Sequence, residues 1–151
     1  MMFILLSLSA CTLTNDRTKT VATIDSGPKD IPTTMSEISP PYTAKFEIYT
    51  NGTKRIFTAE MYHDQSKDVY IESTDPSIVH VTKDNITWDY FFKTLPFSLS
   101  KECLITGTKQ TFCNSDSGQL RFILNGEEVP NSLDLIIKEK DTLEVRYGKS
   151  R

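Results

Sequence analysis

The sequence has no excess of positive charge and none of the short motifs that mark common enzyme classes. Its 17 Lys and Arg residues are outnumbered by 20 Asp and Glu, which gives a formal net charge of −3. Nucleic-acid-binding domains usually carry a basic patch that neutralises phosphates, so this class is not expected. The chain also lacks a Gly-Lys-Ser/Thr phosphate loop, a nucleophile elbow and a Cys-x-x-Cys pair. We therefore expect neither catalysis nor a bound cofactor.

Long apolar runs are scarce, and one of them opens the chain. Met1 to Ala10 contains no charged residue, but it is far shorter than the roughly 20 residues that a membrane-spanning helix needs. The run has the length of the apolar core of a secretory signal peptide, although no Lys or Arg precedes it. We therefore expect residues 1–10 to be a signal peptide.

The end of this run, Leu8-Ser9-Ala10-Cys11, resembles the lipobox of prokaryotic lipoproteins, in which an aliphatic and two small residues precede a cysteine. The resemblance implies cleavage before Cys11 and lipid on its thiol, which would anchor the exported chain at the outer face of a membrane. Two acyl chains anchor a protein stably, whereas one binds only marginally. Two alternatives stay open: secretion without an anchor, and an N-terminal strand with a chance cysteine.

The segment 11–41 lacks any apolar periodicity. Fourteen of the thirty residues from Thr12 to Pro41 are Thr, Ser or Pro. Such a composition buries too little apolar surface to offset the entropy of an ordered chain. We predict a lipid-anchored flexible tether over 11–41, followed by one folded domain over residues 42–148.

Cysteine is also rare, which makes the two remaining ones informative. Cys103 and Cys113 are an even pair in a chain with an expected export signal, and such pairs oxidise in extracellular compartments. A turn over residues 107–109 would place them directly opposite each other on two antiparallel strands, within the reach of a disulfide. The spacing predicts a structural staple that contributes roughly 2–3 kcal/mol.

Turn residues between short β-branched runs predict a mainly β domain. Asn51-Gly52 and Asn125-Gly126 are typical of tight β-hairpins. The first turn predicts a hairpin of strands 44–50 and 54–62. The other expected strands lie within 68–73, 77–82, 118–130 and 133–148.

One helix is predicted between Thr87, which can cap its first turn, and Pro96, which ends it. Four apolar residues fall on one face at spacings of three and four: Trp88, Phe91, Phe92 and Leu95. We expect this face to pack against the sheet.

The C-terminal part of the chain resembles the β-grasp group, which includes the soluble ligand-binding β-grasp domains and the transcobalamin-like modules. The resemblance rests on the strand that closes on Asn125-Gly126, on the apolar residues 136–137, and on the alternating strand 143–148. Lys140 stands where the group usually has Gly before Asp. The resemblance implies an α+β, mainly β fold: a β-grasp-like mixed sheet with one short packed helix and a disulfide-stapled hairpin.

The longer span from about Phe46 to Gly148 is similar to a family of small exported proteins, mostly archaeal, whose function is unknown. Members share a His-bearing strand, a Phe-Phe helix, a cysteine pair and the same closing strands. The matching pieces here are residues 78–81, residues 88–95, Cys103 with Cys113, and residues 122–147. These motifs imply a fold more sharply than a function.

Few side chains are suited to bind metal. His63 and His80 are the two histidines, and together with Asp64 they could hold copper or zinc if the fold brought them onto adjacent strands. The alternative is that they are ordinary strand residues. Asn51 and Asn85 begin N-glycosylation sequons, for which the alternative is unmodified turn chemistry.

We therefore predict a surface-tethered, non-enzymatic module that binds a partner protein or a small ligand. An edge strand or the aromatic helix face would supply its contact surface. Two alternatives stay open. The chain could be a thiol-redox or metal-handling exported protein that uses its cysteine pair or its histidines, or it could be a structural subunit of a cell-envelope assembly.

Overall fold

The computed structural model describes residues 39–149 of the chain. The predicted signal peptide, the lipidation site at Cys11 and the predicted tether up to residue 38 lie outside this range. Within it, no helix is both long enough and apolar enough to cross a membrane.

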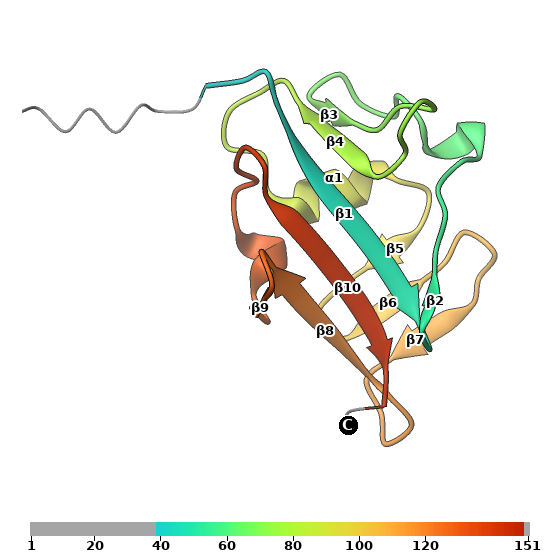
Figure 1. The fold of residues 1–151 in the computed structure, drawn as a ribbon. Helices are drawn as coiled ribbons and strands as arrows, with labels where there is room; N and C mark the ends of the chain where they lie inside the picture. The colour runs from blue at the N-terminus through green and yellow to red at the C-terminus, as the bar shows by residue number, and fades with distance from the viewer. Residues whose placement is uncertain (1–38, 150–151) are drawn as a thin grey trace, which may run out of the picture. The chain divides into compact units, whose positions relative to one another are not determined.

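The described residues are mainly β, with one α-helix and two sheets (Figure 1). The larger sheet is mixed and has seven strands. Six of them lie in the order β3 (Val69–Tyr70), β4 (Ile78–Val81), β1 (Tyr42–Thr50), β10 (Thr142–Gly148), β8 (Gln119–Leu124) and β9 (Glu127–Glu128), and β2 (Thr53–Lys54) pairs with β1. The first and last strands, β1 and β10, are parallel neighbours at the centre, whereas the other pairs are antiparallel.

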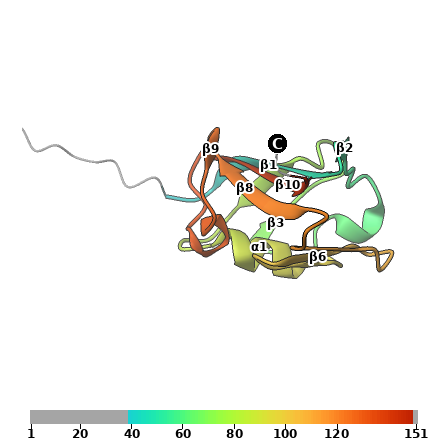
Figure 2. The same ribbon diagram turned by 90° about the horizontal axis from the view of Figure 1, so that it is seen from below.

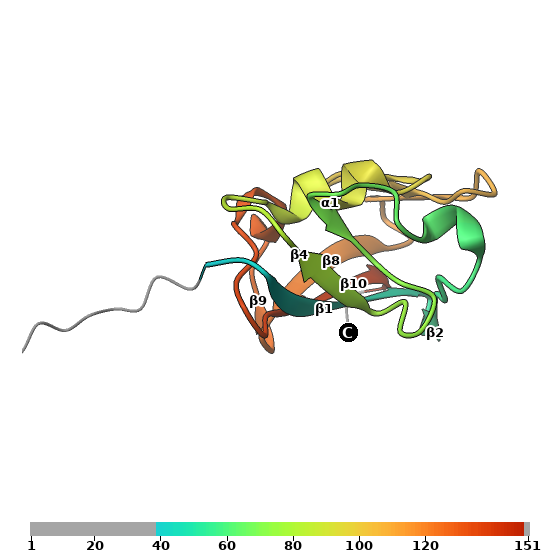
Figure 3. The same ribbon diagram turned by 90° about the horizontal axis from the view of Figure 1, so that it is seen from above.

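Alternation along β1 and β10 makes one face of this sheet apolar. Phe46 lies beside Leu143 and Ile48 beside Val145, and all four are buried. The intervening residues, such as Glu47, point to the other face, because successive side chains of a strand point to opposite sides. Figures 2 and 3 show helix α1 on one side of this sheet, and none of the described elements covers the other side, which we call the open face.

The predicted helix is confirmed as α1 (Trp88–Thr94). Thr87 caps it, since its Oγ1 accepts a hydrogen bond from the Tyr90 N–H at 3.2 Å. The buried face of the helix meets β1 through edge-on ring contacts: the Phe46 ring centre lies 5.2 Å from that of Phe91 and 5.7 Å from that of Phe92.

The smaller sheet contains β5 (Ser98–Leu99), β6 (Cys103–Ile105) and β7 (Thr111–Cys113). Cys103 lies directly opposite Cys113 and is joined to it by a disulfide, as predicted. The Thr106 N–H donates to the Gln110 carbonyl at 2.9 Å, and Lys109 adopts a positive φ of 64°. These features close the hairpin with the predicted turn at 107–109.

Both predicted Asn-Gly turns are confirmed, and all four of their residues have positive φ. The second turn is tied to the start of β10. The Asn125 amide donates to Asp141 Oδ1 at 2.9 Å, and its Oδ1 accepts from the Thr142 N–H at 2.8 Å. The β8–β9 hairpin is therefore held against the last strand.

The predicted strand 54–62 is wrong beyond its start. The chain leaves β1 after Arg55, whose N–H donates to the Ile48 carbonyl at 2.7 Å, and then forms the 3-10 helix η1 (Glu60–Tyr62). The reason lies in the tertiary structure: β4 pairs with β1 from Tyr42 to Lys45 along the same edge. Within the predicted region 133–148, the final strand is confirmed as β10, whereas the chain before it forms the 3-10 helix η2 (Ser132–Asp134) and an isolated bridge from Ile136 to Thr87.

Candidate functional site

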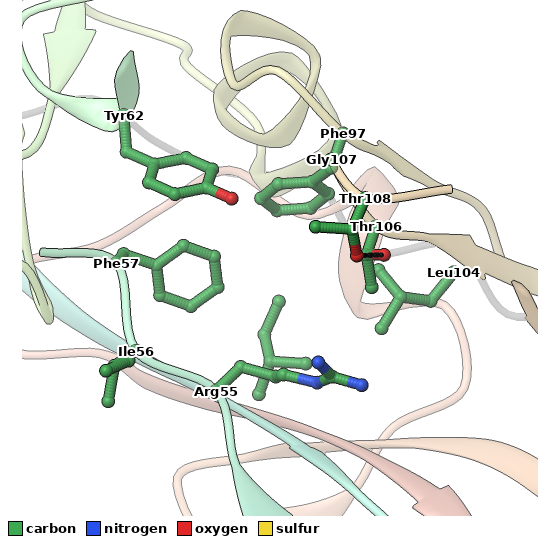
Figure 4. A pocket seen from close by; sticks show the side chains of 10 residues that line it. Arg55, Ile56, Phe57, Tyr62, Phe97, Leu104, Thr106, Gly107 and Thr108 are labelled. Carbon is green, nitrogen blue, oxygen red and sulfur yellow. Dashed lines mark hydrogen bonds between the residues drawn. The ribbon is translucent and has the colours of Figure 1, made fainter. Parts of the chain in front are cut away.

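A pocket of about 110 Å³ lies between the loop that follows β2 and the disulfide hairpin (Figure 4). Its lining residues come from β1, from the loop and η1, from the chain after α1, and from the hairpin. They are Ile48, Arg55, Ile56, Phe57, Tyr62, Phe97, Leu104, Thr106, Gly107 and Thr108. We call this site the aromatic pocket.

Three aromatic rings form one wall of the aromatic pocket. The ring centre of Phe57 lies 5.2 Å from that of Tyr62 and 5.7 Å from that of Phe97. Phe57 also contacts Phe46 of the core, with 5.1 Å between ring centres. Since Ile48 on β1 is buried as well, the pocket is built directly onto the centre of the main sheet.

Gly107 lets the hairpin approach the loop closely. A β-carbon at this position would lie 3.3 Å from both the Pro96 carbonyl oxygen and the Tyr62 hydroxyl oxygen. Real β-carbons rarely come so close to another heavy atom, so a larger residue would push these groups apart. The hydroxyls of Thr106 and Thr108 lie 3.0 Å apart beside it, and a dashed line in Figure 4 marks their hydrogen bond.

Arg55 is held at the pocket by three contacts. Its Nε–H donates to Thr50 Oγ1 at 2.8 Å, and its Nη2 donates to Gln110 Oε1 at 3.2 Å. Its guanidinium carbon lies 5.1 Å from the centre of the Phe112 ring, a cation–π distance. Arginine has five N–H donors, so others remain for a ligand. Among the described residues that line the pocket, Arg55 alone is charged.

The rim of the aromatic pocket exposes two large apolar side chains. Ile56 is 74% exposed and Met61 is 50% exposed. Met61 is close to the hairpin, because its Cε would lie 3.8 Å from a β-carbon at Gly107. Such exposure raises the free energy of the isolated molecule in water, and a covering partner would remove this cost.

Two further hollows extend the surface on either side. One of about 200 Å³ shares Arg55, Ile56 and Phe57 with the aromatic pocket. The other, of about 460 Å³, shares Phe97 and Thr106. The pocket is thus the middle of a longer hollowed surface that crosses the loop and the hairpin.

The predicted metal residues have separate environments. His63 is buried, and its Nε2 lies 2.9 Å from the Phe57 carbonyl oxygen, so it supports the loop behind the aromatic pocket. His80 stacks on Tyr70, with ring centres 5.1 Å apart. Asp64 donates its backbone N–H to the Ile71 carbonyl at 3.1 Å. Over residues 39–149, no three His, Cys, Asp or Glu side chains are grouped as metal ligands would be.

Both predicted glycosylation residues lie on exposed turns. Asn51 and Asn85 have positive φ values of 51° and 60°, a conformation that asparagine tolerates better than most residues. Their position leaves both amides accessible, and their modification stays a prediction.

The sequence did not reveal the residues of the aromatic pocket. The sequence pattern predicts a strand for Arg55, Phe57 and Tyr62 and only a turn position for Gly107, and it predicts no role for Phe97. The one available signal was the imperfect apolar alternation after residue 54, which marks the place where the chain leaves the sheet. Comparison with protein-family models, with curated proteins and with solved structures finds no match for this chain.

Proposed function

We propose that this chain is a non-enzymatic binding module. Its aromatic pocket binds a segment of a partner protein, and lipid on Cys11 tethers the chain to the outer face of a membrane. The observation that carries the proposal is an apolar pocket, built on the centre of the sheet, with exposed Ile56 and Met61 at its rim. Interface hot spots have this form: an anchor side chain fills a desolvated pocket, and surrounding contacts exclude water.

The fold of this module is proposed to be β-grasp-like. Support comes from the mixed sheet whose one apolar face holds the single described helix, and from the hairpin stapled by Cys103 and Cys113. The closing Asn125-Gly126 turn and the last strand β10 also follow the expected pattern. Residues 136–138, where the group would have an apolar strand, depart from it, because Ile136 forms only an isolated bridge with Thr87.

The size of the pocket favours a partner side chain over a free small ligand. Pockets that enclose a drug-sized ligand measure about 300–1,000 Å³. The aromatic pocket measures about 110 Å³, which suits one aliphatic or aromatic side chain. The hollows on either side would then accept the neighbouring residues of an extended segment.

Charge complementarity defines the rest of the partner segment. The guanidinium group of Arg55 is positioned in advance by Thr50 and Gln110, so its binding costs little side-chain entropy. Arginine pairs with carboxylates through parallel N–H···O bonds. The segment should therefore carry an Asp or Glu beside its apolar anchor residue.

Selection from a phage-displayed library of short random peptides tests this assignment on the purified full chain. Enriched peptides should pair an apolar residue with Asp or Glu. The variant Ile56→Ser should bind them about tenfold more weakly, since it removes apolar contact area at the rim. The variant Arg55→Gln should retain the apolar preference but lose the acidic one.

The matched control is Leu135→Ser, because Leu135 is also an exposed apolar residue but does not line the pocket. This control should bind like the wild type. Equal binding by wild type and Ile56→Ser would refute the site. Binding of a small carboxylate with no peptide enriched would assign the pocket to a small ligand instead.

The lipid anchor has its own test. Mass spectrometry should find a chain that begins at a lipid-bearing Cys11, and an intact Met1 in membranes would exclude the anchor.

A further inference from the structure

The open face of the main sheet, which faces the viewer in Figure 1 with α1 behind it, carries a row of cations. The strand registers place Lys54 beside Tyr49, Tyr49 beside Arg146, and Arg146 beside Arg121. Four adjacent strands therefore contribute one residue each to a single line across the sheet. This row lies on the opposite side of the sheet from the helix, and none of its members lines the aromatic pocket.

Two of the three cations are neutralised by the neighbouring acidic row. Lys54 forms an ion pair with Glu47 at 2.7 Å. Arg146 pairs with Glu144, and its guanidinium carbon lies 5.0 Å from the centre of the Tyr49 ring. Across the described residues, Arg121 takes part in no ion pair, although it is partly buried and faces Arg146 directly. The row thus ends in a charge without a counter-charge.

Two unfavourable features coincide at this point. Like charges that face each other across an antiparallel pair destabilise a sheet. In addition, the Arg121 Nε is buried and has no hydrogen-bond partner within residues 39–149. Buried donors in native proteins almost always have a partner, and a lone one often marks an ion or water that completes the site. Proteins tolerate such local conflicts mainly where function requires them.

We propose that Arg121 and Arg146 together bind a phosphate group on the open face of the main sheet. Glu144 neutralises one of the two guanidinium groups, so one positive charge remains for an anion. A phosphate offers three acceptor oxygens, which can reach two guanidinium groups on adjacent strands, whereas a carboxylate has two. The bound phosphate supplies the counter-charge that Arg121 lacks among the described residues and screens the repulsion between the two arginines. The same chemistry is found in free phosphate and in a phospholipid headgroup.

The test follows the Nε–H resonances of the arginines in the ¹⁵N-labelled full chain. Inorganic phosphate, added against sodium chloride at equal ionic strength, should shift the Arg121 and Arg146 signals in a saturable manner. Arg121→Gln should weaken binding about tenfold or more, because it removes a charge-assisted contact. Lys54→Gln is the matched control, since Lys54 belongs to the same row but is already paired, and its affinity should equal that of the wild type.

A second titration, with a soluble short-chain phosphatidylglycerol, distinguishes a phospholipid headgroup from free phosphate as the natural ligand. A stronger response to this lipid assigns the site to a headgroup, and an equal or weaker response assigns it to free phosphate. An unchanged Arg121 signal in both titrations would overturn the proposal. So would a response to acetate as strong as that to phosphate, or a loss of phosphate affinity in Lys54→Gln as large as that in Arg121→Gln. Unchanged backbone spectra of both variants would show that folding is not the cause. None of these results depends on peptide binding at the aromatic pocket.

Discussion

The centre of the main sheet and the wall of the aromatic pocket are held together by different means. The centre combines two long parallel strands, β1 and β10, with a helix whose rings fill the space beneath them. The pocket wall consists of an irregular loop with the 3-10 helix η1, the short segment around Phe97 that follows α1, and a hairpin closed by a disulfide. Burial of apolar surface dominates in the first region, whereas a covalent bond and a few specific contacts dominate in the second.

This difference shows how the chain combines a stable body with an exposed binding surface. A loop that keeps Ile56 and Met61 in water cannot gain much stability from its own burial. It is instead connected to the core through Phe57 and His63, and to the hairpin through Arg55. Substitutions in each region measure the two kinds of stabilisation separately.

The largest effect is expected in the core. Phe91→Ala should lower the free energy of unfolding by about 3–5 kcal/mol, because the removed ring is fully buried against Phe46, Trp88 and Phe92. Urea unfolding, monitored by the fluorescence of Trp88, measures this loss in the free energy of unfolding. Tyr90→Ala is the control on the same helix; Tyr90 is 44% exposed, and its loss should cost under about 1 kcal/mol. Equal losses would mean that the helix does not pack as described.

A smaller effect is expected at the hairpin. Replacing both cysteines, Cys103→Ser with Cys113→Ser, should cost roughly 2–3 kcal/mol, since the disulfide closes a short loop that is free in the reduced unfolded chain. Hydrogen exchange should quicken more at the Thr106 amide than at the Val145 amide in β10, because only the former lies in the hairpin. Reduction of the wild type should reproduce both results. A uniform change in exchange would show that the two regions unfold as one unit.

The smallest effect is a pH dependence on the open face of the sheet. Hydrogen bonds from Lys54 and then Tyr49 lower the pKa of Glu47 from its ordinary 4.5 to about 2. A lowered pKa in the folded state stabilises the protein above the unfolded pKa, and this contribution is lost as the pH falls from about 4.5 through about 2. Lys54 is well exposed, so the contribution should stay below about 1 kcal/mol.

Glu47→Gln checks this effect. The wild type should exceed the variant in stability near neutral pH, and the gap should close by about pH 2 and shrink in high salt. A gap that persists at low pH would assign the role of Glu47 to packing rather than to charge.

Local chemistry explains which parts of the fold were predictable. The cap at Thr87, the stop at Pro96 and the spacing of the aromatic residues specify α1 within one short window. The same holds for the Asn-Gly turns and for the register of Cys103 with Cys113. The predicted strand 54–62 failed because β4, a distant segment, occupies the same edge of β1. No local pattern carries that information.

The sequence by itself determined the helix, the tight turns and the disulfide hairpin, because each depends on residues that are close neighbours along the chain. Only the tertiary structure decided that Arg55, Phe57 and Tyr62 meet Phe97 and Gly107, and that Arg121 faces Arg146. The first encounter arises where the loop that leaves β1 after Arg55 meets the chain that follows α1, and the second arises from the antiparallel pairing of β8 with β10. Pairing of distant strands depends on which edges other segments leave free, so it is a property of the whole packed molecule.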